Sequence, residues 1–318
     1  MLQIPVIDLD PDTDNSATMR AVESACRDVG FMYVVNHGIP VETIAAIRDA
    51  VIGYFQRPLK AKLRDRITRD NYRGYIPTGF FSPAGSGTAA DYYEGYKLHV
   101  EVDEDDEIRQ QCDLYGPNKW PSAPEGFARD VTHYWHACDA VADRLLRLMA
   151  GPLGVDPGWF AGLFASPLTN MTLLHYPAQD GDGFGIHPHK DTDALTILAG
   201  DQVAGLMVRC RDEEAWIDVD PPANALVVNI GDMLELWSGG YFVSTPHKVV
   251  NRTGSERYSF PYFAVPRHDV VVSPLREPQP GFERDDVHVG DVSREVWRTN
   301  WPDAVPYATG FDLGTLED

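Results

Sequence analysis

The second half of the chain is a series of short strand-forming segments, and this pattern restricts the fold more than any other feature. From residue 170 onward, runs rich in Val, Ile, Leu, Tyr and Phe are separated by Gly, Pro and Asp. Such a succession of about eight strands, without helices between them, is typical of a sandwich or a jelly roll with two Greek keys. The runs are NMTLLHYP, ALTILAG, GLMVRC, AWIDV, ALVVNIG, MLELW, YFVSTPHKVVN and RYSFPYFAV.

The first half predicts helices that cover this β core. Apolar residues recur with the helical period in residues 16–30, 41–57 and 124–149. Residues 71–99 are rich in glycine, serine and aromatic residues without a sustained period, so we expect mainly loop there. Because helices precede the strands instead of alternating with them, the expected fold class is α+β with a mainly β core. The core would be a double-stranded β-helix (jelly roll, cupin-like) flanked by N-terminal helices.

Length and composition limit the number of domains and the class of partner. The 318 residues, 43% of them hydrophobic, are enough for one large core, so we expect a single structural domain over residues 1–318. The net charge of −21 would repel nucleic acids and anionic membranes. No run approaches the roughly 18 apolar residues of a membrane span, and the first residues lack a signal-peptide pattern. We therefore expect a cytoplasmic protein without nucleic-acid or membrane partners.

Two histidines and two aspartates alternate in the segment GFGIHPHKDTDALTIL, residues 183–198. If the segment is a strand, side chains two positions apart share a face, so any of the four could contribute to one site. Two neutral imidazoles and one carboxylate on one triangular face form the facial triad of non-haem iron oxygenases. Such a triad would need a second histidine from a distant segment. The candidates are His37, His99, His133, His136, His175, His247, His268 and His288.

His247 differs from the other candidates because it lies in a strand-forming run and precedes Arg257 and Ser259 by about one strand length. An arginine and a hydroxyl two positions apart on one strand face can bind a carboxylate. The guanidinium then supplies two parallel hydrogen bonds and the serine a third. Considered alone, the Arg257 and Ser259 pair would instead indicate a surface salt bridge on an edge strand.

In combination, these segments resemble the isopenicillin N synthase-like family of non-haem Fe(II)/2-oxoglutarate-dependent dioxygenases. The similarity rests on HKDTDALTIL, on ALVVNIGDMLELWSGGYFVSTPHKVVN and on the R-x-S of RYSFPYF. The N-terminal segments IPVIDL, GFMYVVNHGIP, DYYEGY and GPNKWP resemble the same family in the same order. By this resemblance, residues 1–120 are the family's N-terminal helix and strand region, and residues 166–270 are its jelly-roll oxygenase core.

The resemblance implies which residues form the catalytic iron site. His189, Asp191 and His247 correspond to the two histidines and one carboxylate that bind Fe(II). The leucine and threonine that follow the H-x-D motif fix this register, so His187 and Asp193 fall outside the triad. His187 would still lie on the face of the ligands, where it either supports a ligand or lines the substrate side.

The resemblance also implies a site for 2-oxoglutarate. Arg257 and Ser259 would bind the distal carboxylate of this cosubstrate, and Tyr176 would add a hydrogen bond. Leu174 stands where several plant members have asparagine, so the cosubstrate pocket differs from theirs at that position.

The implied activity is oxidation of an unactivated C–H bond of a small molecule with Fe(II), 2-oxoglutarate and O2, releasing succinate and CO2. Hydroxylation is the default outcome, and desaturation or cyclisation are variants. The sequence leaves two alternatives open. The first is a 2-oxoglutarate-independent Fe(II) oxidase of the same fold, of the isopenicillin N synthase or aminocyclopropane-carboxylate oxidase type. The second is a non-catalytic jelly-roll binding protein. The partner we expect is a small-molecule substrate, such as a natural-product precursor.

Overall fold

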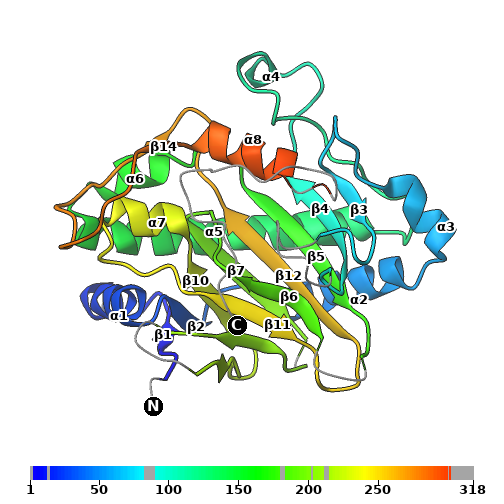
Figure 1. The fold of residues 1–318 in the computed structure, drawn as a ribbon, viewed down its shortest axis with the longest axis horizontal. Helices are drawn as coiled ribbons and strands as arrows, with labels where there is room; N and C mark the ends of the chain where they lie inside the picture. The colour runs from blue at the N-terminus through cyan, green and yellow to red at the C-terminus, as the bar shows by residue number, and fades with distance from the viewer. Residues whose placement is uncertain are drawn as a thin grey trace.

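An eight-stranded sheet forms the centre of the protein (Figure 1). The structure is a computed structural model that describes residues 3–12, 15–81, 90–179, 183–201, 203–210, 215–299 and 301. The strand order is β1-β2-β10-β7-β12-β5-β4-β3, and all neighbours are antiparallel except β1 and β2. The strands are β1 (Val6–Asp8), β2 (Phe31–Val35), β3 (Gly74–Ile76), β4 (Glu94–His99), β5 (Asn170–Tyr176), β7 (Leu195–Gly200), β10 (Leu226–Ile230) and β12 (Arg257–Ala264).

A second, four-stranded sheet packs on one face of the first and completes the β core. Its order is β6-β11-β8-β9, with β6 (Phe184–His189), β11 (His247–Val250), β8 (Leu206–Val208) and β9 (Ile217–Asp218). One buried apolar cluster contains residues of both sheets, among them Leu174, Leu206, Val227 and Val249. The two-sheet arrangement is the jelly-roll core that the spacing of the strand-forming runs predicts. A separate pair, β13 (Val271–Val272) and β14 (Val287–His288), lies outside both sheets.

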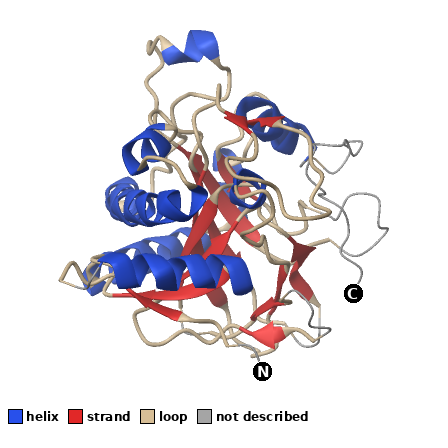
Figure 2. Cartoon of the chain, turned by 90° about the vertical axis from the view of Figure 1, so that its left-hand side faces the viewer, coloured by secondary structure: helices blue, strands red, loops and turns tan. Residues whose placement is uncertain are grey.

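Helices cover the opposite face of the main sheet, and Figure 2 shows the long helices gathered on one side of the strands. Helix α2 contacts β5 and β12, and α5 contacts β7 and β12. None of the helices in the described ranges has the length and apolar character needed to cross a membrane. The helices are α1 (Asn15–Asp28), α2 (Val41–Phe55), α3 (Leu59–Lys62), the 3-10 turn η1 (Leu63–Asp65), α4 (Ile108–Gln111), α5 (Phe127–Leu153), α6 (Pro157–Gly162), α7 (Asp232–Trp237) and α8 (Val289–Thr299).

One predicted element is wrong, and one segment contains strands that were not predicted. Residues 71–99, expected to be mainly loop, contain β3 and β4 at one edge of the main sheet; residues 82–89 lie outside the described part. Five of the six β4 residues are buried, so the strand lacks the alternation of polar and apolar residues that would have revealed it. The run MLELW is not a strand but helix α7, in which every residue is buried. A short, mostly apolar run does not distinguish the two kinds of element.

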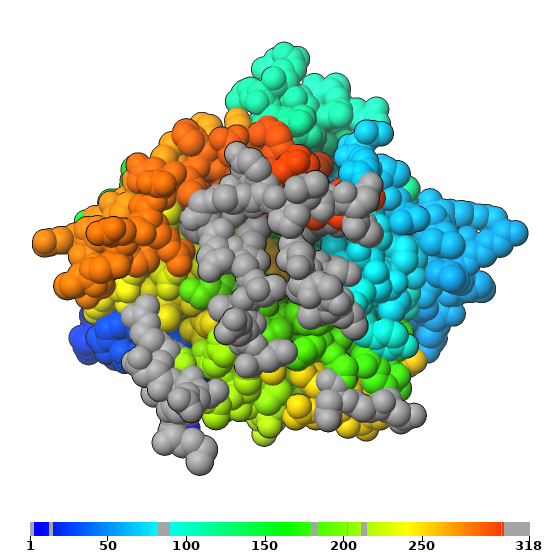
Figure 3. Space-filling view, viewed as in Figure 1, coloured from blue at the N-terminus to red at the C-terminus, as the bar shows by residue number. Residues whose placement is uncertain are grey.

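Each strand of the main sheet has one side chain row toward the helices and one toward the smaller sheet. Ile197, Tyr262 and Leu98 belong to the helix-facing core. Thr196 and Ser259 lie at the alternate positions of β7 and β12 and therefore face the jelly-roll interior. In Figure 3 the orange segment that follows β12 and the cyan region of β3 and β4 flank the green and yellow strands on opposite sides.

Candidate metal centre and cosubstrate site

The structure brings His189, Asp191 and His247 together at one end of the smaller sheet. His189 ends β6 and pairs with His247 at the start of β11, and Asp191 lies in the turn that follows β6. The Nε2 atoms of His189 and of His247 each lie 3.7 Å from Asp191 Oδ1. Within the described ranges, this is the only group of three or more His, Cys, Asp or Glu side chains spaced to hold a metal ion.

Both imidazoles are oriented by hydrogen bonds from the nitrogen that faces away from Asp191. His189 Nδ1 lies 2.8 Å from the carbonyl oxygen of His187, and His247 Nδ1 lies 3.1 Å from that of Thr245. Each Nδ1–H donates to a carbonyl, so each Nε2 carries its lone pair toward Asp191, as in metal-binding histidines. Burial and the neighbouring His189 lower the pKa of His247 to about 4. His247 is therefore neutral at physiological pH, which is the form that binds metals.

Hydrogen bonds fix one oxygen of the Asp191 carboxylate, and the other oxygen faces the two imidazoles. Its Oδ2 accepts hydrogen bonds from Thr196 Oγ1 at 2.6 Å and from Asn229 Nδ2 at 2.8 Å. Burial alone would raise the pKa of Asp191. The adjacent imidazoles of His247 and His189 and the two hydrogen bonds outweigh that effect and lower the pKa. Asp191 is therefore ionised, and its Oδ1 faces the two imidazoles.

Asp193 lies behind this carboxylate and is not one of the three clustered side chains. Thr196 Oγ1 lies 2.9 Å from Asp193 Oδ2 as well as close to Asp191, and one hydroxyl proton cannot serve both acceptors. Burial and the negative charge of Asp191 raise the pKa of Asp193 well above its usual range. Protonated Asp193 can therefore donate to Thr196, which in turn donates to Asp191.

His187 supports the site through its main chain. Its carbonyl oxygen accepts the hydrogen bond from His189 Nδ1. Asp91 Oδ1 in turn accepts from the backbone N–H of His187 at 3.0 Å and lies 2.6 Å from His187 Nδ1. Of the two roles considered for His187, support of a ligand is thus the one with a contact in the structure.

Arg257, Ser259 and Tyr176 lie together on the interior face of the main sheet. Arg257 pairs with Tyr176 across β12 and β5, and its guanidinium carbon lies 4.9 Å from the centre of the Tyr176 ring. Arg257 Nη1 is 3.4 Å from Ser259 Oγ, and Nε donates to the carbonyl oxygen of Val203 at 3.2 Å. The side chains of Arg257, Ser259 and Tyr176 are all buried.

The position of Arg257 is not that of a surface salt bridge. β12 is an internal strand with β7 and β5 on its two sides. In the part of the chain that the structure describes, no carboxylate oxygen comes within 4.0 Å of its guanidinium. A buried cation without a carboxylate partner favours an anionic ligand. The pair of Arg257 and Ser259 therefore suits a carboxylate.

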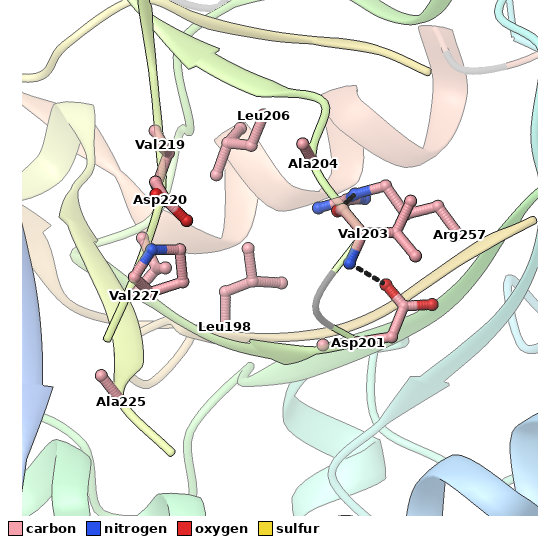
Figure 4. A pocket seen from close by; sticks show the side chains of 12 residues that line it. Leu198, Asp201, Val203, Ala204, Leu206, Val219, Asp220, Ala225, Val227 and Arg257 are labelled. Carbon is pink, nitrogen blue, oxygen red and sulfur yellow. Dashed lines mark hydrogen bonds between the residues drawn. The ribbon is translucent and has the colours of Figure 1, made fainter. Parts of the chain in front are cut away.

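A pocket borders Arg257 between β7, β8 and β10 (Figure 4). The guanidinium lies at one end, and Leu198, Leu206 and Val227 supply apolar surface. Asp201 lies beside the arginine, where its carboxylate accepts a hydrogen bond from the backbone N–H of Val203. The lining is about evenly polar and apolar, and it includes the carboxylates Asp201 and Asp220 as well as the guanidinium of Arg257.

Sequence reasoning missed the residues that position Asp191. Asn229 lies in the strand-forming run ALVVNIG, which forms β10, and its side chain holds Asp191. Thr196 served only to fix the register of the motif. These two residues are direct neighbours across β10 and β7, a pairing that depends on long-range strand register and leaves no local signal.

Comparison with known proteins assigns the family. Residues 4–123 match the family described as non-haem dioxygenase in morphine synthesis N-terminal, and residues 168–266 match the 2OG-Fe(II) oxygenase superfamily. Azadirone synthase LFS of Melia azedarach is 33% identical over 283 residues, covering 85% of this chain and 83% of that protein. The chain belongs to the 2-oxoglutarate- and Fe(II)-dependent oxygenases.

Further relatives agree with this assignment. The 2-oxoglutarate-Fe(II) type oxidoreductase hxnY of Emericella nidulans is 32% identical over 276 residues, covering 81% of this oxygenase and 78% of hxnY. The crystal structure of JOX2 in complex with 2OG, Fe and JA has a TM-score of 0.77 at 28% identity, covering 91% of this oxygenase and 83% of that chain. These findings confirm an enzyme that uses Fe(II), 2-oxoglutarate and O2 and oxidises a small molecule. They favour it over the 2-oxoglutarate-independent oxidase.

Proposed function

We propose that His189, Asp191 and His247 are the residues with which this oxygenase holds Fe(II). The observation that carries the proposal is the placement of both Nε2 atoms at 3.7 Å from Asp191 Oδ1. Two neutral imidazoles and one ionised carboxylate are the donor set that suits ferrous iron in a facial triad. When bound, the iron, together with 2-oxoglutarate and O2, supplies the oxidising power that breaks a C–H bond of the substrate.

The protein's own part begins with fixing these three ligands. Hydrogen bonds from Thr196 and Asn229 occupy Asp191 Oδ2, so a metal meets only Oδ1. Main-chain carbonyls hold both imidazole rings by Nδ1. A rigid set of three ligands on one side leaves the other side of the ion for cosubstrate and oxygen.

Arg257, Ser259 and Tyr176 then bind the distal carboxylate of 2-oxoglutarate. The guanidinium supplies charge-assisted hydrogen bonds, and the Ser259 hydroxyl adds a donor. Burial raises the pKa of Tyr176, although Arg257 and Ser259 oppose the shift, so the phenol keeps its proton and can also donate. This anchoring fixes the cosubstrate at the end opposite to its metal-binding keto acid.

The substrate we propose is a small natural-product precursor, oxidised in the cytoplasm. The relative named azadirone synthase and the JOX2 complex with JA support a small organic substrate. Hydroxylation is the default outcome when a C–H bond lies close to the metal. The four cysteines are free and buried, which agrees with a reducing compartment.

Iron binding and succinate release test the ligand assignment. Metal-free enzyme should bind one Fe(II) per chain and release succinate from 2-oxoglutarate only when Fe(II) and O2 are both present. His247→Ala should lose most of its affinity for Fe(II), because one of three ligands is gone. His136→Ala is the matched control, since the His136 side chain is 72% exposed on helix α5. Unchanged iron affinity in His247→Ala would contradict the assignment.

A further inference from the structure

Lys97 is a positive charge on the metal side of the main sheet that the proposed mechanism does not use. It lies in β4 directly opposite Thr172 of β5. Asn170 follows at the next position of the same face, and it pairs with Phe263 of β12, which pairs with Thr196 of β7. Thr196 holds Asp191. A continuous row of interior side chains therefore leads from the metal centre to Lys97.

The Lys97 ammonium is held in place by neutral groups only. Nζ donates to Asn170 Oδ1 at 2.6 Å and to Thr172 Oγ1 at 3.0 Å, and it lies 5.1 Å from the centre of the Phe263 ring. No carboxylate oxygen of the described residues lies within 4.0 Å of it. An ammonium has three N–H donors, and two of them account for these hydrogen bonds. The third is left for a ligand.

The lowered pKa of Lys97 agrees with a binding site for an anion. Burial lowers the pKa of Lys97 to about 7, although the nearby side chains of Asp193 and Asp191 oppose the shift. A bound anion would offset the desolvation of the ammonium and restore its charge.

The distances fit a small molecule. Neighbouring strands are about 4.8 Å apart, so the two steps from Thr196 through Phe263 to Asn170 span about 10 Å. Arg257 and Ser259, in contrast, lie along β12, with Ser259 about 13 Å from Phe263. Seen from the metal centre, Lys97 therefore lies in a different direction from Arg257 and Ser259.

We infer that Lys97, Asn170 and Thr172 form the subsite that recognises the substrate, and that the substrate carries a carboxylate which binds there. This inference rests on the proposed function, because it takes the metal to lie at His189 and Asp191. The carboxylate would accept a hydrogen bond from the third N–H of Lys97, which would fix one end of the substrate. A C–H bond some bond lengths away would then lie at the metal.

Matched acid and ester probes test this subsite. The probes are benzoate, cinnamate, indole-3-acetate and jasmonate, each compared with its methyl ester. Binding is followed as a change in the visible band of the anaerobic complex of enzyme, Fe(II) and 2-oxoglutarate. We expect at least one acid to bind about ten- to a hundred-fold more tightly than its ester, the range of a charge-assisted hydrogen bond. Acids that bind no better than their esters, including no response to any probe, would overturn the inference.

Three variants show whether Lys97 is the cause. Lys97→Met should lose the preference for the acid, and Lys97→Arg should keep most of it. Asn170→Asp should also lose the preference, because its new carboxylate would pair with the Lys97 ammonium in place of the substrate. The affinity of Lys97→Met for 2-oxoglutarate should stay within about three-fold of the original enzyme. A Lys97→Met variant that keeps the preference would contradict the inference.

The same experiment separates this inference from the proposed function. Arg257→Met is expected to weaken the binding of 2-oxoglutarate. If Lys97→Met weakens it to the same extent, Lys97 binds the cosubstrate and the proposed substrate subsite is wrong, while the oxygenase assignment stands. If the original enzyme gives no visible band with Fe(II) and 2-oxoglutarate, the proposed function fails and this inference fails with it.

Discussion

Two charged residues of β4, the buried Glu94 and the half-buried Lys97, lie three positions apart on opposite faces of the sheet and have different surroundings. On the helix side, the Glu94 carboxylate accepts from Lys62 Nζ at 2.6 Å and from the Tyr75 hydroxyl at 2.5 Å, and lies 2.9 Å from His175 Nδ1. On the metal side, Lys97 Nζ donates to the neutral oxygens of Asn170 and Thr172. Glu94 has a counter-charge in direct contact, whereas no carboxylate oxygen of the described residues lies within 4.0 Å of Lys97 Nζ.

The difference indicates which charges serve the fold and which serve a ligand. A buried charge with a counter-charge and several hydrogen bonds is internally satisfied, and removing its partner is costly. A buried cation with no counter-charge is costly to maintain and suits a binding role. Arg257 resembles Lys97 in that no carboxylate oxygen of the described residues lies within 4.0 Å of its guanidinium, although Asp201 lies beside it, and both cations lie on the jelly-roll face of the sheet. The following predictions test this comparison from either side.

Asp191→Ala should have the largest effect. Loss of the one anionic ligand should reduce succinate release about a thousand-fold or more, because iron is no longer held for the reaction. Folding should be largely preserved, which far-ultraviolet circular dichroism can check. Asp49→Ala, at an aspartate whose side chain is 80% exposed, is the control and should match the original activity. Unchanged succinate production in Asp191→Ala would rule out the ligand assignment.

Glu94→Gln should affect stability and leave the metal site intact. The variant keeps the shape of the side chain but leaves the Lys62 ammonium buried without a counter-charge. We expect it to lower the free energy of unfolding by about 3 to 5 kcal/mol, measured by urea denaturation. The affinity of the folded variant for Fe(II) and 2-oxoglutarate should not change. A loss of cosubstrate affinity at full folding would show that the two faces are not separate.

The overall fold and the grouping of His189, Asp191 and His247 could be predicted from sequence for different reasons. Strand-forming runs with turn residues between them have a local signal, and they correspond to β5, β7, β8, β9, β10, β11 and β12. The grouping of His189, Asp191 and His247 rested on resemblance, because alternation alone also allowed His187 and Asp193. The roles of Asn229, Thr196 and Asp91 came only from the structure.

The position of Lys97 shows why such roles escape sequence reasoning. It lies in a segment that was expected to be loop, so no strand face could be assigned to it. Its partners Asn170 and Thr172 are more than seventy positions away, and they meet Lys97 through the register of β4 and β5. Pairings of this kind depend on tertiary contacts that a single sequence does not show.

Arg257→Met tests the second unbalanced cation. Without the guanidinium, the KM for 2-oxoglutarate in succinate release should rise about a hundred-fold, and the affinity for Fe(II) should not change. Ser259→Ala, which removes only a neutral donor, should raise the KM about five- to ten-fold. Equal effects of the two variants would show that the positive charge is not what binds the cosubstrate.

Lys97→Met should have the smallest effect on stability, and the size of this effect depends on pH. Because the pKa of Lys97 falls to about 7 in the folded protein, the unfolded chain binds the proton more tightly. The cost of this lysine is therefore complete below about pH 7 and declines as the pH rises toward the ordinary lysine value. Lys97→Met should be more stable than the original protein near pH 7, by about 1 kcal/mol after allowance for partial exposure. A difference that grows between pH 7 and pH 10 would contradict the unbalanced state of Lys97.

The most direct measurement is an anaerobic spectral titration of the Fe(II)-loaded enzyme with 2-oxoglutarate. A visible metal-to-ligand charge-transfer band should develop in the original enzyme, fail to appear in Asp191→Ala, and require about a hundred-fold more 2-oxoglutarate in Arg257→Met. The band should be retained in Glu94→Gln, in which only the internally balanced charge is changed. A band of full intensity in Asp191→Ala, or an unchanged 2-oxoglutarate requirement in Arg257→Met, would contradict the assignment of the site to the jelly-roll face.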